Sequence, residues 1–78
     1  MSTILQMVRE LAAVVGSDSE LLGMNGRTVQ IRKGSLRLEI PTPALVDVHL
    51  RFKGEQRRWH LERLVGDALA AASRSAEP

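Results

Sequence analysis

The sequence contains no cysteine and no tyrosine, and it has a single phenylalanine and a single tryptophan. Without cysteine, disulfide bonds and cysteine-based metal sites are excluded. Without tyrosine, and with Phe52 expected to face inward, the outward face of the predicted sheet lacks the aromatic side chains on which single-stranded nucleic acids stack. These absences exclude a disulfide-stabilised scaffold and argue against an aromatic platform for unpaired bases on the sheet.

Long hydrophobic runs are also missing, because no apolar stretch approaches the ~18 residues that span a bilayer. The first residues have neither the charged segment nor the cleavage site of a signal peptide. We therefore expect a soluble, cytoplasmic protein without a membrane partner. The 78 residues have room for one domain, placed at 1–74, with a frayed tail at 75–78. So small a core is expected to need self-association for support.

Apolar residues recur at helical spacing near both ends of the chain. The first set predicts a helix over about 3–15 that ends at Gly16, with an inward face made by Ile4, Met7, Val8, Leu11 and Val15. The second set predicts a helix from Glu55 to about Arg74, with an inward face made by Leu61, Leu64, Val65, Ala68, Leu69 and Ala72.

The middle of the chain alternates between apolar and polar residues, as strands do. Asn25-Gly26 and Lys33-Gly34 are expected to form two-residue hairpin turns, which would place Leu22 opposite Val29 in the first hairpin and Ile31 opposite Leu36 in the second. A further strand is expected over 46–53. Its inward residues would be Val46, Val48, Leu50 and Phe52, and its outward residues Asp47, His49, Arg51 and Lys53.

These elements predict an α+β fold of two layers. An antiparallel meander of three or four strands would carry the N-terminal and C-terminal helices on one face. The opposite face of the sheet would be left to solvent or to a partner.

Positive charge is concentrated in the central half of the chain, although the net charge is only +2. Arginine and lysine side chains on a sheet face can bind the phosphates of nucleic acid. The candidate nucleic-acid-binding residues are Arg32, Arg37, Arg51, Lys53, Arg57 and Arg58. The alternative is a solvated face on which Arg37 and Arg51 pair with Glu39 and Asp47 across strands.

Trp59 lies about 160° from Leu61 on a helical wheel, well away from the inward face, and it shares its own face with Gly66 and Ala70. An exposed tryptophan beside small residues is typical of a protein-protein interface. A symmetric dimer would be the simplest result. The alternative is that Trp59 folds back over the edge of the sheet and joins the core.

No set of residues matches a catalytic or metal site. His49 and His60 have no partner at ligand spacing, and no nucleophile has an adjacent base. We expect neither enzymatic activity, nor a metal or cofactor, nor a small-molecule substrate.

The order helix, meander, helix resembles that of double-stranded-RNA-binding domains and, more loosely, that of small dimeric nucleoid-associated proteins. The sequence departs from the first at residues 53–58, which lack a lysine cluster, and from the second in its short first helix. Neither family is assigned. The sequence predicts a small non-catalytic binding module that contacts nucleic acid through its basic residues. The alternative is a protein-interaction or assembly module that uses the face around Trp59.

Overall fold

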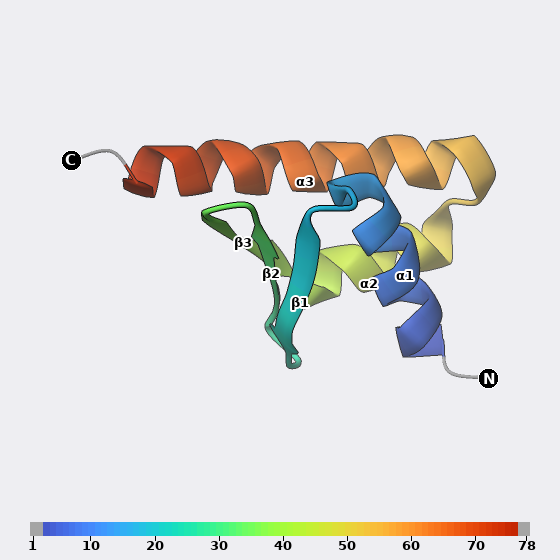
Figure 1. Ribbon diagram of the computed structural model, residues 1–78. Helices are drawn as coiled ribbons and strands as arrows, with labels where there is room; N and C mark the ends of the chain where they lie inside the picture. The colour runs from blue at the N-terminus through green and yellow to red at the C-terminus, as the bar shows by residue number, and fades with distance from the viewer. Residues whose placement is uncertain (1–2, 77–78) are drawn as a thin grey trace.

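The computed structural model describes residues 3–76, which fold as an α+β unit with a three-stranded antiparallel sheet (Figure 1). The elements are α1 (Thr3–Val15), β1 (Ser19–Met24), β2 (Thr28–Lys33), β3 (Leu36–Pro41), α2 (Thr42–Arg51) and α3 (Gly54–Ala76). The strands lie in the order β1-β2-β3, and the helices pack on the sheet. The predicted fold class is confirmed.

The first helix has the predicted bounds, and Gly16 follows it with a positive φ of 123°. Met7, Leu11 and Val15 are buried, whereas Ile4 is more than half exposed. The prediction that Ile4 belongs to the core is therefore wrong, because the core ends at the turn that contains Met7. Lys33 reaches this helix from β2, and its Nζ donates a hydrogen bond of 2.6 Å to the carbonyl oxygen of Val15.

The first hairpin turns at Asn25, but its register differs from the prediction. Met24 lies opposite Val29, and an irregularity at Leu22 interrupts the pairing. Neither Asn25 nor Gly26 has a positive φ. Instead, the side-chain oxygen of Asn25 accepts hydrogen bonds from the backbone N–H groups of Arg27 and Thr28, at 2.7 and 2.9 Å. The turn is therefore stabilised by an asparagine side chain rather than by left-handed backbone.

The second hairpin has Gly34 and Ser35 as its loop, with a φ of 58° at Gly34. Lys33 lies opposite Leu36, and Ile31 opposite Leu38, so the predicted register was wrong by two residues. Side chains alternate with a period of two, and a shift of two residues leaves each on the same face. The residues predicted to point inward and outward on β2 and β3 therefore do so, although the predicted pairing between the strands is wrong.

The predicted strand over 46–53 does not form, because most of this segment belongs to α2. Pro43 lies in the first turn of the helix, where a missing backbone N–H costs nothing. Leu45 and Val48 are buried at helical spacing, while Leu50 is 75% exposed. The start of α2 is held by Thr42, whose hydroxyl donates a hydrogen bond of 2.7 Å to the carbonyl oxygen of Asn25.

The longest element is α3, which has 23 residues and lies along the 41 Å dimension of the molecule. Phe52 and Lys53 separate it from α2, and its first residue, Gly54, has a φ of 58°. The predicted inward residues all lie in the core or pack against it. The helix continues through Ala76, and residues 77–78 of the expected tail lie outside the described residues. No helix within residues 3–76 is both long enough and apolar enough to span a membrane.

The sheet has one buried face and one uncovered face. Val29, Ile31, Leu38 and Ile40 point into the core, and the residues between them point the other way. The last turns of α3 project past the sheet on the uncovered side (Figure 1). This arrangement leaves two surfaces of α3 without a covering element: the face opposite the core, and the end that extends beyond the sheet.

Candidate functional site

Trp59 lies on the first turns of α3 with 52% of its surface exposed. Its indole ring meets the His60 ring edge-on, with 4.8 Å between centroids, and the guanidinium of Arg63 lies 5.0 Å from its centre. Leu61 is buried and faces the core. Residues two apart point to nearly opposite sides of a helix, so Trp59 faces away from the core. The structure therefore excludes the alternative in which Trp59 joins the core.

Gly66 and Ala70 lie on the same side of α3 as Trp59 and are exposed. A Cβ atom added at Gly66 would meet no atom within 4 Å, so no neighbour within the described chain requires a glycine there. Glycine in an exposed helix interior costs about 1 kcal/mol relative to alanine. We call the surface made by Trp59, Gly66 and Ala70 the Trp59 face.

Two of the six basic candidates, Arg32 and Arg37, lie on the uncovered face of the sheet, as predicted. Arg32 forms an exposed ion pair with Glu20 on β1. Within residues 3–76, no ion pair involves Arg37. In the alternative interpretation, Arg37 would pair with a carboxylate across strands. No such pair forms among residues 3–76, and Arg37 lies opposite Arg32.

Arg51 and Lys53 do not lie on the sheet, because the segment expected to be a strand is helical. Arg51 pairs along α2 with Asp47 at 3.3 Å, four residues away. Lys53 lies in the link between α2 and α3 and is exposed. The prediction that Arg51 and Lys53 share the sheet face with Arg32 and Arg37 is therefore wrong. The other four candidates lie at the end of α2, in the link and on the first turns of α3.

Arg57 is a structural residue in this fold. Its side chain is 14% exposed and forms an ion pair of 2.9 Å with Glu10 on α1. It also donates hydrogen bonds to the carbonyl oxygens of Phe52 and His49, at 2.8 and 3.0 Å. These contacts join α1, the end of α2 and α3. Arg58, the next residue, is exposed and has no ion pair among the described residues.

The two histidines lie close to this junction. His60 stacks on Phe52, with 3.7 Å between ring centroids. His49 has a side chain that is only 12% exposed, and its buried Nδ1 lies 3.4 Å from a Glu10 oxygen without forming a hydrogen bond. The expectation that His49 is an ordinary surface histidine on a strand is therefore wrong. Residues 3–76 contain no cluster of three or more His, Asp or Glu side chains that could hold a metal ion.

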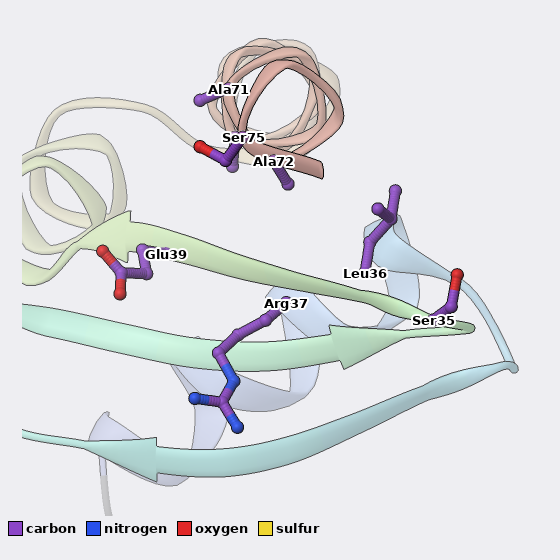
Figure 2. Close-up of a pocket in the computed structure, with 8 residues that line it drawn as sticks. Ser35, Leu36, Arg37, Glu39, Ala71, Ala72 and Ser75 are labelled. Carbon is purple, nitrogen blue, oxygen red and sulfur yellow. The ribbon is translucent and has the colours of Figure 1, made fainter. Parts of the chain in front are cut away.

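A groove that the sequence did not predict lies where α3 projects past the sheet (Figure 2). It has a volume of about 500 Å³ and is open to solvent. Its walls are the small side chains of α3 on one side and β3 with the preceding turn on the other: Ala68, Ala71, Ala72 and Ser75 face Ser35, Leu36, Arg37 and Glu39. Helical periodicity placed Ala68 and Ala72 on the inward face, but it did not indicate where the sheet ends beneath them.

No family model matches the sequence, and no curated protein or solved structure is significantly similar to it.

Proposed function

We propose that this chain is a small non-catalytic binding module that contacts another protein through the Trp59 face. The observation that carries the proposal is the 52% exposure of the only tryptophan, on the side of α3 that faces away from the core. Tryptophan is enriched among the residues that dominate binding energy at protein interfaces. Exposing so large an apolar ring favours its burial by a partner.

The surroundings of Trp59 support the same proposal. Arg63 lies over the indole, and arginine is also enriched at interface centres. Gly66, two turns further along, leaves the backbone accessible, so another helix or a large side chain can approach closely. An exposed aromatic side chain beside an accessible stretch of helix backbone forms a compact binding surface.

The proposal is tested by affinity capture from the source lysate with the tagged chain and two variants. Trp59→Ala is expected to lose a specific protein that the native chain retains. Leu50→Ala is the matched control, since Leu50 is a large exposed apolar residue on α2. Equal retention of every protein by the native chain and by Trp59→Ala would remove the proposal.

A second candidate function is nucleic-acid binding through Lys53 and Arg58, together with the exposed Arg37 and the ion-paired Arg32 and Arg51. The observation that favours it is that Lys53 and Arg58 lie near the α2–α3 link, exposed and without ion pairs among residues 3–76. Phosphate binding releases counterions, so affinity for duplex DNA or RNA would fall steeply with added salt. Duplex titrations at several salt concentrations test it, and a lack of salt-sensitive binding would exclude it.

A further inference from the structure

The inward stripe of α3 continues past the end of the core. Ala68 is buried against the sheet, whereas Ala71 and Ser75, further along the same side of the helix, are exposed. Figure 2 shows Ala72 directed toward β3 and Ala71 and Ser75 on the adjoining side of α3, with the open groove between α3 and β3. The small residues on this side of α3 therefore pack on the sheet at Ala68 and are open to solvent in the last turns of the helix.

The chain exposes more surface than a compact monomer of its mass. Its solvent-accessible surface is 5468 Å², whereas a compact monomer of 8.6 kDa is expected to expose about 4,700 Å². The projecting end of α3 contributes to this difference because it lengthens the molecule to 41 Å in one direction and 23 and 22 Å in the others.

We propose that the groove is occupied by the projecting end of α3 from a second copy of this chain, in an antiparallel, two-fold symmetric dimer. A two-fold axis level with Ala71 and Ala72 would bring each of these residues close to its own counterpart in the second copy. The same axis would place Ala68 against Ser75 of the second copy. Small residues along the contact allow two helix backbones to approach closely, and each copy fills the groove of the other.

Charge complementarity selects the antiparallel orientation. Asp67 and Arg74 are seven residues apart and therefore lie within about 20° of each other on the helix. Two-fold symmetry between antiparallel helices brings residues of the same flank together. About the axis at Ala71 and Ala72, Asp67 is offset from Arg74 of the second copy by about 3 Å along the helix. The arginine side chain is long enough to span this offset, and the pair occurs twice. Neither residue has an ion pair among residues 3–76.

Arg37 adds a second complementary contact. It lies on the uncovered sheet face that forms one wall of the groove (Figure 2). In the antiparallel arrangement, the C-terminal end of the second copy's α3 points toward this face. The carbonyl groups at a helix C-terminus carry partial negative charge and favour a nearby cation. The carbonyl groups at the end of the second copy's α3 would thus stabilise the charge of Arg37, which forms no ion pair among residues 3–76.

The dimer does not depend on the proposed function, because the groove and the Trp59 face lie on different sides of α3. A dimer would display two Trp59 faces, both directed away from its own contact. The two ideas can therefore fail separately.

Sedimentation equilibrium of the purified chain tests the dimer directly. We expect dimers at about 100 µM, a concentration at which weak specific contacts are populated. Ala71→Arg places a long charged side chain at the centre of the contact, at an exposed helix position, and is expected to raise the dissociation constant at least tenfold. Glu62→Arg is the matched control, since Glu62 is exposed on the side of α3 away from the groove, and Trp59→Ala is expected to remain dimeric.

Charge reversal tests the orientation independently of folding. Asp67→Arg and Arg74→Asp each place like charges at both symmetric contacts, and each variant alone is expected to be monomeric. Mixed in equal amounts, they restore both opposite-charge pairs and are expected to form the heterodimer, detected by native mass spectrometry. A native chain that stays monomeric at ~100 µM, or a dimer that Trp59→Ala dissociates and Ala71→Arg does not, would overturn the proposal. Absence of the heterodimer from the mixture would also overturn it.

Discussion

The guanidinium of Arg57 on α3 lies 2.9 Å from the carboxylate of Glu10 on α1, although 47 residues separate them in the sequence. The same guanidinium binds the carbonyl oxygens of Phe52 and His49, so it satisfies the backbone at the end of α2. One side chain thus fixes the relative positions of all three helices. This geometry assigns Arg57 to the stability of the fold and separates it from its exposed neighbour Arg58.

Removing this junction is expected to destabilise the fold. Arg57→Ala should lower the free energy of unfolding by about 2–3 kcal/mol, since it leaves Glu10 unpaired and two carbonyl oxygens without donors. Glu10→Ala should lower the free energy of unfolding by about 1–2 kcal/mol, because it leaves the Arg57 guanidinium without its carboxylate partner. Urea denaturation measures both. Asp47→Ala, which removes the carboxylate of an exposed i,i+4 ion pair on α2, is the control and should cost less than about 0.5 kcal/mol. Equal losses for Glu10→Ala and Asp47→Ala would contradict the structural role.

The contact between Lys33 and Asp18 predicts a dependence of stability on pH. The hydrogen bond from the Lys33 side chain lowers the pKa of Asp18 below its ordinary value of 3.8. A carboxyl group whose pKa is lower in the folded state stabilises the fold above pH 3.8 and loses that contribution as pH falls through the folded-state pKa. Asp18→Asn removes this titration.

The unfolding midpoints of the native chain and Asp18→Asn should therefore differ at about pH 6 and converge as pH falls through the folded-state pKa of Asp18. Thermal unfolding followed by circular dichroism across this range makes the comparison. A difference between the two proteins that does not change with pH would show that the ion pair contributes nothing to stability.

The helical nature of residues 42–51 can be tested with two leucines. Leu45 is 1% exposed, whereas Leu50 is 75% exposed. Leu45→Ala should cost about 2–5 kcal/mol because it creates a cavity in the core, and Leu50→Ala should cost less than about 0.5 kcal/mol. In a strand with Leu50 on its inward side, the order of the two effects would be reversed. Chemical denaturation of the two variants decides between the alternatives.

This segment also shows why part of the fold could not be predicted from the sequence. Val46, Val48, Leu50 and Phe52 alternate with polar residues, which is the pattern of a strand. Helical spacing is present as well, in Leu45, Val48 and Phe52, and Pro43 marks a helix start. Val48 and Phe52 fit both the strand spacing and the helix spacing, so the spacing of apolar residues alone does not decide between the two structures. In the helix, Leu45 and Val48 are both buried in the core. The helix α3 packs against β3, at the position where a further strand would pair.

The binding surfaces were predictable to different degrees. Trp59 is two residues from a strongly periodic inward position, so the helix period indicated its outward position, and the structure was needed to exclude burial against the edge of the sheet. The sequence makes Arg57 a nucleic-acid candidate because it is basic and follows the basic strand residues at the start of the second helix. Its carboxylate partner lies on α1, and local sequence does not reveal such a contact. The groove beside Ala71 depends on where the sheet ends beneath α3, which is a tertiary property.

Gly66 gives a prediction that separates folding from binding. Gly66→Ala should stabilise the isolated chain by about 0.5–1 kcal/mol, because alanine is the better helix former and its Cβ meets no neighbour within 4 Å. The same substitution should weaken binding of the protein captured through the Trp59 face at least tenfold, about 1.4 kcal/mol, by blocking close approach to the backbone. Thermal unfolding and a binding titration measure the two effects. A more stable variant with unchanged affinity would show that the partner does not contact Gly66.

Site-specific photocrosslinking in the source cells tests the Trp59 face most directly. A photoreactive phenylalanine analogue replaces Trp59 in one variant and Ala70 in a second, and exposed Arg9 on α1 serves as the control position. We expect the variants at positions 59 and 70 to form the same covalent adduct with one protein, and the variant at position 9 to form none. An adduct at position 9 of equal yield, or no adduct at positions 59 and 70, would contradict the assignment of this face to protein binding.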